Sequence, residues 1–363
     1  MFGFNKKIKQ IAGRDRRRQR PQRAAKRTRA YPWTEWSDQK LLDTRICDLG
    51  LTIEGSEIAP LIGQLNRELG QRGFVFRPHC WLSDTWFCPD GVPGFAIPFY
   101  FAHPRLKRLE KTHMLEIEGI NKSACMRLMR HETAHALANA YRLHLRQAWR
   151  RRFGRASRTY PDSYLPRPGS KNYVLHLEGW YAQSHPAEDW AETFAVWLDP
   201  GTRWQQRYRD WPAIKKLNYV DELMKEIVPR PAPVRTRKQI DAVSTIKLTL
   251  REYFNEKQAR LKQEFPRLHE QQLHDLFSGK TGRNERASRF LRRTRREAID
   301  LTARWTSDAR YRIDQTLKDM IKRCDELDLY VPGQEKQMKL QLIAALVMLY
   351  MGSMRSGKSR LTV

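Results

Sequence analysis

Apolar residues recur at helical spacing along much of the chain. In the segment 56–70, four of them lie on one helical face, and a glycine stands where the helix would end. These four residues are Leu61, Ile62, Leu65 and Leu69. The same spacing returns from Ser123 to Tyr141, and again from Pro186, a residue suited to a first helical turn, to Leu198. The pattern therefore predicts a helix in each of these three segments.

Two stretches between the first and second of these helices favour extended backbone. The segment 73–78 (GFVFRP) is strand-like, and the segment 86–101 contains an Asp-Gly turn signal followed by an apolar run. Pro93 and Pro98 lie in or near that run and cannot donate a hydrogen bond to a neighbouring strand. We therefore expect residues 95–101 to form a strand at the edge of a sheet.

The last third of the chain has a different pattern. A proline-rich segment, Val228–Lys238, is typical of a boundary between domains, and the sequence after it is helical in character. We predict a core over residues 31–228, a linker over 229–238 and a helical region over 239–363. The apolar run 342–352 is too short to span a bilayer, so it predicts a buried helix and no transmembrane segment.

Positive charge is unevenly distributed along this pattern. The formal net charge is +28, and residues 1–30 hold twelve Lys and Arg but one acid. This segment lacks the apolar run of a signal peptide and predicts a basic disordered tail, which can contact nucleic acid or another polyanion. Residues 283–304 carry eight arginines beside an apolar stripe. We expect that helix to dock through its stripe and leave a basic face in solvent, with phosphate contact as the alternative.

Two further features are the apolar stripe of the helix 283–304 and the five cysteines. The stripe is formed by Ala287, Phe290, Leu291, Ala298, Leu301 and Trp305. The five cysteines form no CxxC pair, and their odd number leaves one unpaired in any scheme of disulfides. We therefore expect free thiols in a cytoplasmic protein.

One short motif carries candidate chemistry. The sequence HETAH, residues 131–135, lies inside the helix predicted from Ser123. Because residues four apart share a helical face, His131 and His135 can bind one metal ion. Glu132 would then point at a water molecule on that ion and could take its proton. The alternative is a pair of histidines hydrogen-bonded in a core.

A catalytic zinc needs a third protein ligand, and the helix that begins at Pro186 can supply it. The candidates in its first turns are His185, Glu188, Asp189 and Glu192. Glu188 and Glu192 are four residues apart, which suits one carboxylate on the metal and another that accepts the Nδ1–H of a ligand histidine. The residues themselves leave open which acid binds the metal.

These two segments together resemble a bacterial family of zinc-binding metallopeptidases, a gluzincin-like group, and more distantly the catalytic domains of anthrax lethal factor and the Mlc titration factor. The shared pattern is HExxH followed by Tyr-x6-Glu-x3-Glu, and here 52 residues separate His135 from Glu188. The segment 86–106 also looks like this family, so the resemblance covers roughly residues 45–223. It implies an α+β fold: a zincin core with a small mixed sheet and an active-site helix, followed by an all-helical C-terminal region.

The resemblance also implies roles for individual residues. His131, His135 and Glu188 would hold one Zn²⁺ per chain, and Glu192 would orient one of these ligands without touching the metal. Tyr181, seven residues before Glu188, would hydrogen-bond the oxyanion of a tetrahedral intermediate.

By the same analogy, an edge strand would receive the backbone of a peptide substrate as a further strand. The residues that would form this strand are Gly94, Phe95, Ala96 and Ile97.

Two functions from different classes follow from these observations. The first is a zinc-dependent metallohydrolase, in particular a peptidase acting on a peptide or protein, with Glu132 as general base. The second is a nucleic-acid-binding protein whose HExxH motif is a vestigial or structural metal site. The basic segments favour the second function, but a structural site has no need of Glu132.

Overall fold

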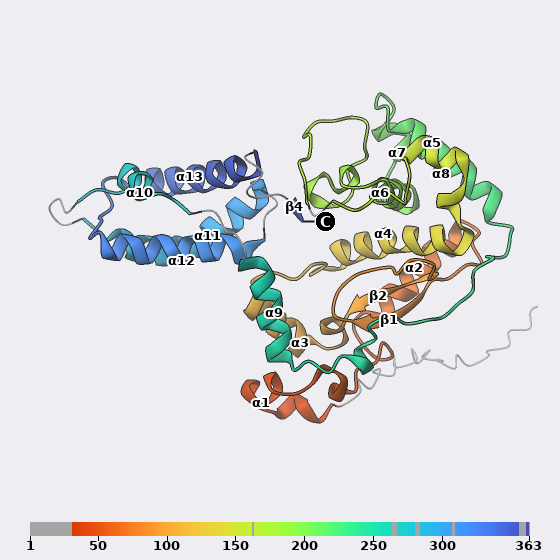
Figure 1. Cartoon of the computed structure of the whole chain (residues 1–363), viewed down its shortest axis with the longest axis horizontal. Helices are drawn as coiled ribbons and strands as arrows, with labels where there is room; N and C mark the ends of the chain where they lie inside the picture. Colours follow the sequence, from red (N-terminus) through yellow and green to blue (C-terminus); the bar gives the residue numbers. More distant parts are fainter. Residues whose placement is uncertain are drawn as a thin grey trace, which may run out of the picture.

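The computed structural model describes residues 31–161, 163–262, 267–279, 284–306, 309–355 and 361–362. The predicted basic tail, residues 1–30, lies outside the described residues. The described chain is mostly helical, and Figure 1 shows a C-terminal group of helices next to a larger unit that contains a small parallel sheet. This composition is compatible with the predicted α+β class.

The elements follow one another in this order: η1 Pro32–Glu35, α1 Asp38–Leu42, η2 Ile46–Leu49, α2 Ala59–Gln71, β1 His79–Ser83, β2 Gly94–Pro98, η3 Phe99–Ala102, α3 Pro104–Met114, α4 Lys122–Tyr141, η4 Leu143–Leu145, α5 Gln147–Phe153, β3 Ser163–Tyr164, η5 Glu178–Gln183, α6 Pro186–Leu198, α7 Trp204–Arg207, α8 Ile214–Ile227, η6 Val243–Thr245, α9 Leu250–Lys262, α10 Glu270–Leu276, α11 Ala287–Thr306, α12 Arg310–Glu326, α13 Glu335–Arg355 and β4 Leu361–Thr362. β1 and β2 pair in parallel, whereas β3 and β4 pair antiparallel. The three helices predicted from periodicity correspond to α2, α4 and α6.

The parallel sheet differs in one strand from the prediction. The strand expected at residues 73–78 is wrong: this segment is unpaired, and the ladder begins at His79. The Arg77 guanidinium donates hydrogen bonds to the carbonyls of Phe74 and Phe76, which a neighbouring strand would otherwise use. Gly94 is required at the start of β2, because a Cβ there would lie 2.4 Å from His79.

α4 and α6 form the centre of the larger unit. α4 begins at Asn121, whose side chain accepts the Ala124 N–H at 2.9 Å and so caps the helix. α6 begins at the predicted Pro186. The Trp190 indole N–H of α6 donates to the Ala134 carbonyl of α4 at 3.0 Å, which fixes how the two helices face each other.

The two largest hydrophobic clusters cover successive parts of the described chain. The first cluster runs from Tyr31 to Phe254 and the second from Leu268 to Tyr350. Within the predicted linker, 229–238, Ala232 packs against the first cluster. The Val234 N–H of the same segment donates to the Ala140 carbonyl at 3.1 Å, because a proline-rich backbone with few internal hydrogen bonds needs partners from the core.

The C-terminal helices pack through one face each. α11 buries Phe290, Leu291 and Ala298 as predicted, but Trp305 is 69% exposed and lies outside the buried stripe. α13 buries every fourth residue along one side, whereas Met348 on another side is 74% exposed, so the predicted buried helix is buried on one side. Among the described residues, no helix combines the length and the apolar character needed to cross a membrane.

Candidate metal centre

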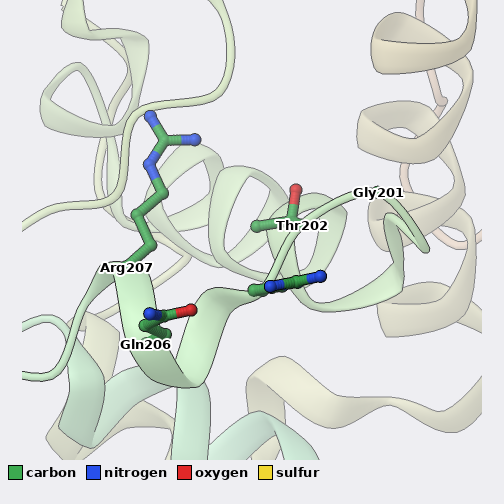
Figure 2. A pocket seen from close by; sticks show the side chains of 5 residues that line it. Gly201, Thr202, Gln206 and Arg207 are labelled. Carbon is green, nitrogen blue, oxygen red and sulfur yellow. The ribbon is translucent and has the colours of Figure 1, made fainter.

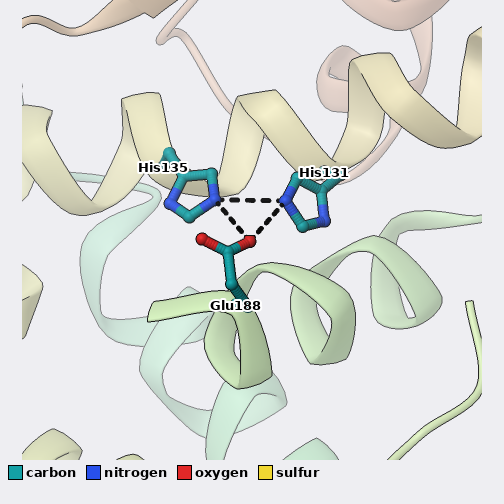
Figure 3. A group of neighbouring side chains, drawn as sticks. All are labelled: His131, His135 and Glu188. Carbon is teal, nitrogen blue, oxygen red and sulfur yellow. Dashed lines mark hydrogen bonds and ion pairs between the residues drawn. The ribbon is translucent and has the colours of Figure 1, made fainter. Parts of the chain in front are cut away.

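His131, His135 and Glu188 converge between α4 and α6 (Figure 3). The Glu188 Oε2 atom lies 2.9 Å from His131 Nε2 and 3.3 Å from His135 Nε2. The two histidine nitrogens are 3.2 Å apart. Two imidazole nitrogens and one carboxylate oxygen are a donor set suited to a catalytic zinc, which keeps a further position open. These residues therefore fit the ion that the sequence predicts.

Glu192 occupies a different place, one helical turn beyond Glu188. Its Oε1 atom lies 2.8 Å from His131 Nδ1, and its Oε2 atom accepts the Leu177 N–H at 2.8 Å. This contact places the proton of the neutral His131 ring on Nδ1 and leaves the Nε2 lone pair facing the cluster. Burial lowers the pKa of His131, but the hydrogen bonds and charges of the two glutamates outweigh it and raise that pKa. A metal ion at this site would therefore compete with a proton for His131.

The other two candidate ligands do not face the cluster. Asp189 forms a buried ion pair with Lys216 at 2.6 Å. Burial raises the pKa of Asp189 to about 7, although Lys216 opposes this shift. His185 caps α6, because its Nδ1 atom accepts the Ala187 N–H at 3.2 Å. Of the four acids and histidines that the sequence offered for the third ligand position, Glu188 alone belongs to the three-residue cluster.

Glu132 is buried beside the two histidines. Burial raises the pKa of Glu132, while the charges of His131 and His135 oppose that shift. A carboxyl group with a raised pKa in this position is suited to exchange a proton with a neighbouring group.

Tyr181 approaches the cluster from η5, with its ring centroid 5.6 Å from that of His131. Gly179 and Trp180 precede it with left-handed backbone, at φ 74° and 55°. A tryptophan in this region costs of order 1–3 kcal/mol, and such strain is common where a turn aims a functional side chain. Burial raises the pKa of Tyr181, followed by the charges of Glu188 and Glu132, so the hydroxyl keeps its proton.

Tyr160 is a residue of the site that sequence reasoning missed. Its hydroxyl donates a hydrogen bond to Glu188 Oε1 at 2.8 Å. Its ring stacks on His185 with centroids 3.7 Å apart. Burial and the charge of Glu188 raise the pKa of Tyr160. Tyr160 lies in the segment between α5 and β3, where no periodicity or motif could have indicated it.

Asn139 was also missed, although its position gave a signal. It lies one turn after His135 on α4, on the same helical face. Its amide donates to the carbonyls of Pro89 at 2.9 Å and Val92 at 3.0 Å. Asn139 therefore attaches the Asp-Gly turn, which the sequence predicted, to the helix that carries both histidines.

The free strand edge expected at Gly94–Ile97 is not present. All residues of β2 are buried, and β1 covers one of its edges. On the other edge the Ala96 N–H donates to the Phe87 carbonyl at 2.8 Å, because the Asp-Gly turn folds this segment back as a hairpin. The described pairing at Ala96 speaks against the docking of a substrate backbone on this strand, which stays a prediction.

An open pocket lies at a separate place, next to α7 (Figure 2). It is lined by Gly201, Thr202, Arg203, Gln206 and Arg207. Glu188 lies in the first turn of α6 and this pocket follows the last turn, so about 15 Å of helix separates them. The pocket contains none of the three residues that converge between α4 and α6.

Comparison with known proteins adds a family to this geometry. Residues 122–203 match the model of a family described as "Putative zinc-binding metallo-peptidase". The matched range begins with α4 and ends just after α6, so it contains the three converging residues, Glu132 and Glu192. It covers less than a quarter of the chain. No curated protein and no solved structure matches the chain.

Proposed function

We propose that this protein is a zinc-dependent peptidase with a gluzincin-like zincin core, in which His131, His135 and Glu188 hold one zinc ion. The observation that carries the proposal is the convergence of their three ligand atoms, which lie within 4.8 Å of one another. The family match over the same segment supports it. When bound, zinc supplies a Lewis acid that polarises a carbonyl group and lowers the pKa of water.

The residues of the chain supply the remaining chemistry. The carboxylate of Glu132 accepts a proton from the attacking water and passes it to the leaving nitrogen of a peptide bond. The raised pKa of Glu132 favours this transfer. Tyr181 donates its hydroxyl proton in a hydrogen bond to the oxyanion that forms on the substrate carbonyl. Glu192 keeps His131 in the tautomer that presents Nε2.

The alternative function, binding of nucleic acid, receives no support from the described part of the chain. Several arginines of α11 already have acidic partners within the fold. These ion pairs join Arg292 to Asp325, Arg293 to Glu285 and Glu335, and Arg295 to Asp314. An arginine paired in this way contributes little to a basic surface for phosphate.

The test of the peptidase proposal compares Glu132→Gln with the wild-type chain. Both proteins should contain about one zinc per chain, because Glu132 is not a ligand. Hydrolysis of a mixed peptide library should fall by about 10²- to 10⁴-fold in the variant, since the amide cannot accept the proton. Glu178→Gln, at an exposed glutamate of η5, is the matched control and should keep full activity. A zinc-loaded wild type that cleaves nothing, or a Glu132→Gln variant as active as wild type, would overturn the proposal.

A further inference from the structure

Tyr160 combines features that a purely structural tyrosine does not need. Tyr160 is 45% exposed as a residue, so it is not held in place by burial in the core alone. Its hydroxyl nevertheless reaches a carboxylate whose residue is only 4% exposed, that of Glu188. A hydrogen bond from a hydroxyl to an ionised carboxylate is stronger than one between neutral groups. The polar end of an exposed residue is thus directed at one particular buried atom.

The ring of Tyr160 is held in place by a chain of contacts. It stacks on His185 with an angle of 21° between the ring planes. His185 is fixed in turn, because its Nδ1 atom accepts the Ala187 N–H and its Nε2 atom lies 2.9 Å from the Arg158 carbonyl. Since Nδ1 accepts, the ring proton is on Nε2 and is donated to that carbonyl. The hydroxyl of Tyr160 therefore has a defined position with respect to α6.

The two oxygens of Glu188 have separate partners. Oε1 accepts from Tyr160, whereas Oε2 faces His131 and His135. A carboxylate attached by a flexible side chain can rotate and present either oxygen. The hydrogen bond to Oε1 selects the rotation in which Oε2 points between the two imidazole nitrogens.

We propose that Tyr160 is a positioning residue of the metal centre, which holds Glu188 so that Oε2 is presented together with the two histidines. Glu192 has the corresponding role for His131, so two of the three metal-binding residues are each fixed by a hydrogen bond from outside the cluster. This inference rests on the proposed metal-binding function. Partners of this kind are worth about 10- to 100-fold in metal affinity.

Tyr160 and Tyr181 are thereby assigned different tasks. The Tyr160 hydroxyl is engaged by Glu188, and donating to a substrate would require it to break that bond. Tyr181 lies near His131 and has no comparable bond to a metal-binding residue among the described residues. We therefore assign the hydrogen bond to the oxyanion to Tyr181 rather than to Tyr160.

The experiment measures zinc affinity in Tyr160→Phe, which removes the hydroxyl and retains the ring that stacks on His185. The full chain is freed of metal, and zinc is titrated in competition with a chelator of known affinity. The variant should bind zinc about 10-fold or more weakly than wild type. Tyr141→Phe is the matched control, because it removes a hydroxyl that donates to the Arg230 carbonyl, and it should bind zinc as wild type does. Circular dichroism checks that both variants are folded.

A second measurement separates positioning from direct catalysis. At saturating zinc, Tyr160→Phe should recover most of the wild-type kcat for peptide hydrolysis, because its defect lies in holding the metal-binding carboxylate. Equal zinc affinity in Tyr160→Phe and wild type overturns the positioning role and leaves the peptidase proposal standing. A lower kcat that persists at saturating zinc, without a change in affinity, also overturns it and assigns the hydroxyl to the substrate. A wild-type chain that binds no zinc overturns both proposals.

Discussion

α4 and α11 are both twenty residues long, and they place their polar residues in opposite environments. α4 is buried on nearly all sides, and Arg130, His131 and Glu132 are buried together in its middle. α11 buries apolar and hydroxyl side chains along one face, and its arginines lie toward solvent. Both helices were predicted from periodicity, and both carry residues that suggest a function.

The difference shows which polar residues report on function. A buried charge is costly unless it has a partner, so each one in α4 requires an explanation from the fold. Most arginines of α11 remain hydrated and pair with exposed acids at little cost or gain, whereas Arg295 pairs with the buried Asp314. Polar residues in a buried helix therefore locate the candidate site, whereas the more numerous charges of α11 mainly solvate the C-terminal unit.

The largest expected effect comes from removing the buried charge next to the site. Arg130 binds Glu68 through two nitrogens, at 2.8 and 3.0 Å, and Asp199 at 3.1 Å. Arg130→Met leaves Glu68 buried without its cation, and we expect the free energy of unfolding to fall by about 3–5 kcal/mol in urea titration. Arg130→Met combined with Glu68→Leu should regain much of this loss, because the only carboxylate then left without its cation is that of Asp199, whose side chain is 24% exposed. A loss below about 1 kcal/mol for the single variant would contradict the contrast between the two helices.

Removal of the metal should lower the stability of the larger unit, which contains α4 and α6, by an intermediate amount. Zinc held at 100 times its dissociation constant stabilises the folded state by about 2.7 kcal/mol. Chelation should therefore increase amide hydrogen exchange in α4 and α6 and leave exchange in α11 unchanged, because the two units have separate hydrophobic clusters. An equal increase in α11 would show that the clusters unfold together.

The smallest change in the free energy of unfolding is expected from breaking an ion pair on the surface of α11. Arg292 and Asp325 form an ion pair whose side chains are 56% and 38% exposed. Arg292→Gln should change the free energy of unfolding by about 0–1 kcal/mol, because both groups are well hydrated when separated. The free energies of unfolding of Arg292→Gln and Arg130→Met should be measured by urea titration under the same conditions. A loss as large as that of the buried variant would mean that exposure does not distinguish the two helices.

Sequence alone placed the helices and the motif because both depend on residues close together in the chain. The spacing of apolar residues located α2, α4 and α6, and the two histidines are necessarily on one face of α4. The strand at residues 79–83 was not located, since strand pairing depends on a distant partner, which here is β2.

Only the tertiary structure separated the acids of α6 and brought in Tyr160. Glu188 and Glu192 share a helical face, and the way α6 is docked on α4, with Trp190 bound to the Ala134 carbonyl, places one at the cluster and the other behind His131. Tyr160 reaches Glu188 across 28 residues of chain that carry no repeating pattern. The sequence thus determined which side chains could act at the site, through local periodicity and motif spacing. Which of them converge on one point and which lie behind the converging residues depended on packing between segments that are distant in the chain.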